Sequence, residues 1–89
     1  MIVRWSAPAT ADLLRIIAYI AEQNSIAAQQ AAEALLLAGD SLAIFPRRGR
    51  NGSDGTRELA TVRPYVIVYE VVSDRVLILR IWHAAQDRP

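Results

Sequence analysis

The side chains best suited to chemistry lie in the second half of this chain. Its single histidine, His83, follows Arg57, Arg63 and Arg80 in the sequence. If the fold gathers them, the arginines could hold a scissile phosphate while the imidazole moves a proton. The plainer interpretation, which the sequence favours, is a structural histidine that is hydrogen-bonded at the end of a strand.

Other kinds of catalytic or metal site are not indicated. The chain has no cysteine, so it predicts neither a disulfide nor a thiolate metal site, and a lone histidine cannot form a metal site. Glu58 and Glu70 are expected to pair with arginines on neighbouring strands rather than to act as acid and base. No cofactor is expected.

All ten basic residues are arginines, yet the net charge is only +1, too small for a general attraction to nucleic acid. Three of these arginines, Arg47, Arg48 and Arg50, lie in a glycine-rich segment, residues 47–55. The segment is either a mobile surface connection, which the sequence favours, or a docking loop for phosphate or acidic side chains.

The elements that must position these residues centre on a hairpin. Two apolar runs, residues 65–72 and 76–82, flank the polar step Ser73-Asp74 and predict two strands. Both runs are apolar on both sides, so we expect them at the centre of a sheet that is covered on both faces. Helices can cover one face; the other is expected to meet a partner chain or to form a concave surface of aromatics and arginines.

The first half predicts a strand at residues 2–5 and then two helices. Ser6 is expected to cap the first helix, with the apolar face Leu13, Ile16, Ile17 and Ile20, and with Asp12 and Arg15 mostly away from that face. Asn24 suits a left-handed stop, and Ser25 is expected to cap a second helix over residues 26–44. The heavier stripe of this helix is expected to be Leu35, Ala38, Leu42 and Phe45.

Residues 56–62 predict a further strand, so the order is strand, helix, helix and three strands. The last three should form an antiparallel meander with the helix hairpin on one face, which is a two-layer α+β fold in a single domain over residues 1–89. No apolar run approaches the length needed to cross a bilayer, and the first residues lack the layout of a signal peptide. A cytoplasmic protein is the expectation.

Several segments together resemble the ParE/RelE superfamily of toxins from bacterial type II toxin–antitoxin systems, and most resemble its ParE-type branch. The resemblance spans nearly the whole chain. It is carried by Trp5-Ser6-Ala7-Pro8-Ala9, Asp12-Leu13, Ile16, Tyr19-Ile20, Leu42, Phe45-Pro46, Gly49-Arg50, Thr56-Arg57-Glu58-Leu59, Pro64-Tyr65-Val66-Ile67-Val68-Tyr69 and Leu79-Arg80-Ile81-Trp82-His83-Ala84-Ala85-Gln86-Asp87-Arg88.

The resemblance implies a toxin neutralised by a small cognate antitoxin, often a ribbon-helix-helix protein of the ParD type, whose carboxyl-terminal segment folds on the toxin. ParE-type toxins poison DNA gyrase, whereas RelE-type toxins cut mRNA on the ribosome. The chain has no lysine and no tyrosine after Tyr69, and Ala84 replaces the tyrosine expected beside the histidine in some nucleases. These departures and the low net charge favour the gyrase inhibitor, which has no catalytic residues of its own.

The resemblance also assigns candidate residues. Target-binding candidates are Arg47, Arg48, Arg50, His83, Asp87 and Arg88; antitoxin-binding candidates are Leu14, Arg15, Ala18, Ala21 and Arg57. For the alternative, a ribosome-dependent endonuclease, the candidates are Glu58, Arg63, Arg80 and His83. A third alternative is an inactive homologue that only binds its antitoxin as a co-repressor; sequence-specific DNA binding by this chain and membrane contact are not expected.

Overall fold

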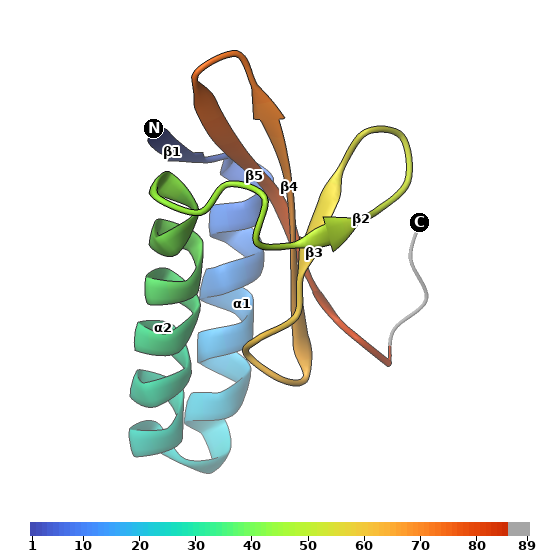
Figure 1. Ribbon diagram of the computed structural model, residues 1–89. Helices are drawn as coiled ribbons and strands as arrows, with labels where there is room; N and C mark the ends of the chain where they lie inside the picture. The colour runs from blue at the N-terminus through green and yellow to red at the C-terminus, as the bar shows by residue number, and fades with distance from the viewer. Residues whose placement is uncertain (86–89) are drawn as a thin grey trace.

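Two helices pack side by side on one face of a five-stranded sheet in the computed structural model, which describes residues 1–85 (Figure 1). The elements in chain order are β1 (Ile2–Trp5), α1 (Ala7–Gln23), α2 (Ser25–Asp40), the 3-10 turn η1 (Ser41–Ala43), β2 (Arg50–Asn51), β3 (Arg57–Leu59), β4 (Tyr65–Val72) and β5 (Arg75–His83). The α+β architecture predicted from the sequence is confirmed.

The sheet has the strand order β1-β5-β4-β3-β2 and is mixed. The expected antiparallel meander is present in β3, β4 and β5, with Val72 opposite Arg75 across the Ser73-Asp74 turn. β1 pairs parallel with β5, and the two helices and three other strands form the long connection that a parallel pair needs. The glycine-rich segment contains the two-residue strand β2, so it is not only a loop, and β3 is shorter than the predicted strand.

The N-terminal cap of α1 agrees with the prediction, whereas the N-terminal cap of α2 differs from it. The Ser6 hydroxyl accepts a hydrogen bond from the Ala9 N–H at 3.1 Å, as expected for a capping serine. Asn24 has an extended backbone, φ −161°, and its side chain accepts from the Ala27 N–H at 3.0 Å. The left-handed stop and the capping role of Ser25 were therefore wrong; Asn24 caps α2 because its amide reaches the first free N–H groups.

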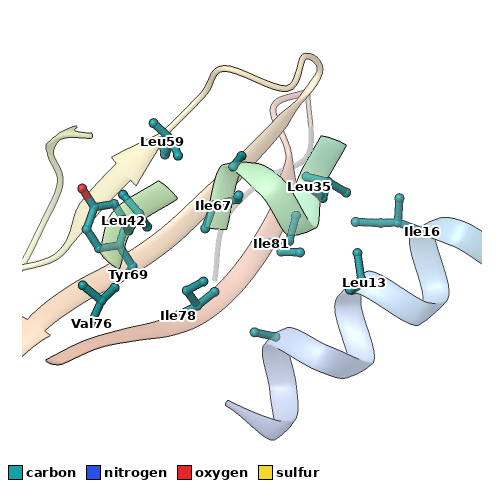
Figure 2. Close-up of a cluster of buried hydrophobic side chains, with 12 residues drawn as sticks. Leu13, Ile16, Leu35, Leu42, Leu59, Ile67, Tyr69, Val76, Ile78 and Ile81 are labelled. Carbon is teal, nitrogen blue, oxygen red and sulfur yellow. The ribbon is translucent and has the colours of Figure 1, made fainter. Parts of the chain in front are cut away.

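The core lies between the helices and the sheet (Figure 2). The predicted positions Leu13 and Ile16 of α1, and Leu35, Ala38 and Leu42 from α2 and η1, are buried there. Phe45 was expected in the same stripe but is 61% exposed, because the α-helix ends at Asp40 and the following 3-10 turn changes the direction of the chain. The sheet contributes Leu59, Ile67, Tyr69, Val76, Ile78 and Ile81.

The opposite face of the sheet carries Val66 and Val68, which are only 2% and 8% exposed. Residues in register on neighbouring strands point to the same face, which places Trp82 beside Val66 and both Arg80 and Glu58 beside Val68. This face therefore carries an aromatic ring and an arginine, in line with the expected surface of aromatics and arginines. The alternative, a partner chain that covers this face, stays a prediction. Within residues 1–85, neither helix has the length and apolar character needed to cross a membrane.

Candidate functional site

Asp12 lies at the centre of a polar cluster, although the sequence placed it on the outer side of its helix. Its side chain is 2% exposed and accepts hydrogen bonds from Arg80 Nε at 2.7 Å, from Arg80 Nη2 at 3.2 Å and from the Ile81 N–H at 2.9 Å. Pairing of β1 with β5 stops at Ile78. Beyond that point the N–H of Ile81, at the unpaired edge of β5, needs an acceptor, and the carboxylate of Asp12 supplies it. Asp12 therefore faces the sheet and not the outer side of its helix.

Arg15 also donates to Asp12, from Nη2 to Oδ1 at 3.0 Å. Burial raises the pKa of Asp12, but the hydrogen bonds from Arg80, Ile81 and Arg15 outweigh it, so the pKa lies below the ordinary carboxyl value. The hydrogen bond with Asp12 in turn raises the pKa of Arg80. The Arg80 guanidinium also lies 4.9 Å from the ring centre of Trp82, which fixes it further.

Glu58 forms an ion pair across the β2–β3 hairpin. Arg50 Nη2 lies 3.0 Å from Glu58 Oε1, and Arg50 Nε donates to the same oxygen at 3.3 Å. Pairing of Glu58 with an arginine of a neighbouring strand is confirmed. It also means that Arg50, expected to contact the target, already holds a carboxylate.

His83 is the last residue of β5, and its Nδ1 accepts a hydrogen bond from the Ala85 N–H at 3.1 Å. Its ring meets Tyr65 edge-on at a centroid distance of 5.7 Å. Both rings line a hollow of about 570 Å³ beside α1, which Arg15 and Tyr19 border. The hydrogen-bonded histidine at a strand end is confirmed.

The four endonuclease candidates do not converge. Glu58 and Arg80 flank Val68 on the face of the sheet away from the helices, whereas His83 lines the hollow beside α1. Arg63 is exposed in the connection between β3 and β4. The structure therefore separates the set into two pairs, Glu58 with Arg80 on one face and His83 near Arg63 at the end of the β4–β5 pair, and does not bring all four into one site. Among residues 1–85, no group of three or more histidine, cysteine or acidic side chains could hold a metal ion.

The loop arginines border an apolar surface that the sequence did not predict. Arg47 and Arg48 line a hollow together with Ile44 and Phe45, which are 76% and 61% exposed. Arg48 Nη1 donates to the Ser41 hydroxyl at 2.9 Å. The sequence held only a partial signal: Ile44 and Phe45 are apolar residues directly before Pro46, where the helical pattern ends.

Four of the antitoxin-binding candidates lie together on α1. Leu14 is 62% exposed, and Arg15, Ala18 and Ala21 are exposed with it. Arg57 is not with them: it is half-buried on β3, two strands away from β5, against which α1 packs. Tyr19, which is 70% exposed on the same helix, was not among the candidates. The target-binding candidates Asp87 and Arg88 lie outside the described residues.

Comparisons with known proteins agree in sequence and in fold. The family described as "ParE toxin of type II toxin-antitoxin system, parDE" matches residues 3–88. Toxin RelE2 of Caulobacter vibrioides is 48% identical over 84 residues, 94% of this chain and 96% of that protein. Toxin RelE1 of the same bacterium is 35% identical over 86 residues, 93% and 92% of the two chains.

A solved structure carries the same fold. The structure described as "Chromosomal ParDE TA system from P. aeruginosa" matches with a TM-score of 0.78 and 27% sequence identity. The match covers 91% of this chain and 92% of that chain. The likeness therefore extends over the helix hairpin and the sheet together.

Proposed function

This chain belongs to the ParE toxin family of type II toxin–antitoxin systems, and on that premise we propose that it binds and inhibits DNA gyrase in the cytoplasm without chemistry of its own. As a type II toxin it has a protein antitoxin as partner. We propose a ParD-like antitoxin, because the solved relative comes from a ParDE system.

One observation carries the proposal of a binding toxin. Two of the four polar residues that could cleave RNA are held in ion pairs: Arg80 with Asp12, and Glu58 with Arg50. An arginine whose guanidinium is fixed by a buried carboxylate is poorly placed to follow the charge of a transition state. The arrangement therefore supports docking rather than catalysis.

The antitoxin surface is proposed to run along α1. Leu14, Ala18 and Ala21 follow one another at helical spacing and are exposed, and Arg15 beside them can meet an acidic side chain. A chain this small that leaves apolar helix surface in water gains stability from a segment that folds onto it. An antitoxin shortened by its carboxyl-terminal half should lose most of its affinity; unchanged affinity would contradict this site.

The second candidate function is a ribosome-dependent mRNA endonuclease. It is favoured by the names of the relatives, RelE1 and RelE2. In that case His83 is the first residue to test. Arg63 is the second, because it lies two residues before Tyr65, which pairs with His83.

The deciding experiment uses the full-length toxin, freed from antitoxin, in two parallel assays. One contains gyrase with supercoiled DNA, and the other contains translating ribosomes with a defined mRNA. We expect gyrase–DNA cleavage complexes to accumulate while the mRNA stays intact. Cut mRNA with normal gyrase would instead support the endonuclease, and His83→Ala should then stop the cutting without unfolding the protein.

Two controls complete the design. A toxin lacking residues 86–89 removes the target-binding candidates Asp87 and Arg88; it should lose gyrase inhibition and keep antitoxin binding. Circular dichroism of every preparation checks that the protein is folded. A folded toxin that is silent in both assays would favour the inactive homologue that only binds its antitoxin.

A further inference from the structure

The loop of the β2–β3 hairpin and the turn between β4 and β5 lie at the same end of the sheet (Figure 1). Residues of both line a polar hollow. Its volume is about 430 Å³, within the range of small-molecule sites. Arg47 and Arg57 line it, together with the amide of Asn51 and the hydroxyls of Thr56 and Ser73. The sequence assigned the two arginines to different partners, but the fold places both in one hollow.

The charge of this hollow is positive and local. Its lining holds two guanidinium groups and no carboxylate. Among residues 1–85 neither Arg47 nor Arg57 takes part in an ion pair, whereas Arg15, Arg50, Arg75 and Arg80 each do. The acidic residues Asp54 and Asp74 lie in the two turns that border the hollow, so the positive charge is local. A local positive charge of this size suits a single phosphate group.

Arg57 is held in place for this role by a buried network. Its Nη1 donates to the Gly49 carbonyl at 2.7 Å. The Gly49 N–H donates to the Tyr69 hydroxyl at 2.9 Å, and this hydroxyl donates to the Pro46 carbonyl at 2.8 Å. Tyr69 is fully buried, so one end of the guanidinium fork is anchored to the core. An anchored arginine loses little side-chain entropy when it binds an anion.

The chemistry of the lining favours phosphate. The two guanidinium groups, the Asn51 amide and the Ser73 hydroxyl offer N–H and O–H donors, which suits a tetrahedral anion with several acceptor oxygens; the Thr56 hydroxyl already donates to the Ser53 carbonyl at 2.6 Å. Many phosphate sites use a helix N-terminus, but here the donors come from β2, β3 and the loops beside them.

We propose that this hollow binds one phosphate group of a nucleic-acid backbone and so gives the toxin a direct contact with the nucleic acid at its target. Gyrase-bound DNA and ribosome-bound mRNA both present such a group. The inference therefore does not depend on which target the toxin has, and its failure would leave the proposal of gyrase inhibition untouched.

The first test is an NMR titration of the full-length toxin with inorganic phosphate, followed by a short single-stranded oligothymidine. Both ligands should shift the backbone amides of Gly52, Gly55 and Ser73 and leave those of α1 unchanged. An oligoglutamate peptide serves as the carboxylate probe. Shifts only elsewhere, or tighter binding of the peptide than of the oligonucleotide in this hollow, would overturn the assignment.

The second test compares two exposed arginines. Arg47→Gln should weaken oligonucleotide binding about fivefold to tenfold and reduce the salt dependence by about one counterion. Arg4→Gln is the matched control: it removes the same charge, but Arg4 is exposed on β1, at the other edge of the sheet, and does not line this hollow. It should change the affinity less than about twofold.

Arg47→Gln should fold normally because the Arg47 side chain is exposed and makes none of the hydrogen bonds described. A melting curve that matches the unmodified protein checks this. Equal losses from the two substitutions would mean that only general charge attracts the strand, and the phosphate site would be rejected.

Discussion

At the scale of the residue, Asp12 is the most constrained polar group of the described chain. It joins α1 to the last strand across 68 residues of sequence, through Arg80 and the Ile81 N–H. The sequence could show that Asp12 is an acid near the start of a helix. It could not show that a strand edge ends opposite it, because that depends on how far β1 pairs with β5.

Asp12→Ala should therefore destabilise the protein by about 3 kcal/mol, because it leaves Arg80 without its partner and the buried Ile81 N–H without an acceptor. Urea unfolding gives the free energy. Arg15→Ala is the matched control: this side chain is 64% exposed, so its loss should cost less than about 1 kcal/mol. Equal effects of the two substitutions would contradict the role of Asp12.

At the scale of the element, α2 approaches β1 at Gly39. Glycine inside a helix is normally unfavourable by about 1 kcal/mol relative to alanine. Here an added Cβ would lie 2.6 Å from Trp5 Cζ2 and 3.0 Å from Ile78 Cδ1. The sequence indicates only a weak point near the end of the helix; the packing explains why a glycine stands there.

Gly39→Ala should accordingly destabilise the protein, by about 1–3 kcal/mol, although helix propensity alone predicts stabilisation. Trp5→Phe removes the clashing part of the indole, so the double variant should be more stable than the sum of the two single effects. Thermal unfolding of the four proteins in this cycle measures the coupling. A Gly39→Ala variant that is more stable than the parent would show that the helix moves freely away from Trp5.

At the scale of the whole molecule, the lowered pKa of Asp12 links folding to pH. The Asp12 carboxylate binds a proton less tightly in the folded protein than in the unfolded chain. Its contribution to the free energy of unfolding is therefore fully present above the ordinary pKa of 3.8 and is lost as the pH falls through the lower pKa of the folded protein. The free energy of unfolding should therefore be steady above about pH 5 and should decline below it.

Asp12→Asn should flatten this decline, because the amide carries no proton to gain in this range. Urea titrations of both proteins between pH 7 and the acid limit of folding, about pH 2–3, measure the difference in slope. The same acid slope in both would place the proton linkage on other carboxylates.

The surface of the molecule is also uneven at this scale. Exposed apolar residues lie on α1, at Leu14 and Tyr19, on α2, at Leu37, and after α2, at Ile44 and Phe45. Patches of this kind mark interaction surfaces in small proteins. They agree with a toxin that is normally held by an antitoxin.

The sequence by itself determined the order of the elements apart from the short β2, the central hairpin, the Ser6 cap and the buried stripe of α1. These follow from local rules: capping acts over three residues, and periodicity of two or 3.6 shows which side of an element is buried. The family resemblance was also present in the sequence, in short segments kept in order. The conformation of Asn24 was also local but was predicted wrongly, because capping and left-handed stops favour the same residue.

Only the tertiary structure decided which distant residues meet. It set β1 parallel to β5, placed Asp12 against Arg80, turned Phe45 to the surface and brought Arg47 and Arg57 into one hollow. No local pattern encodes these outcomes, because strand pairing and helix packing are chosen by the total burial and hydrogen bonding of the chain. The candidate sites could be named from the sequence, but their grouping required the fold.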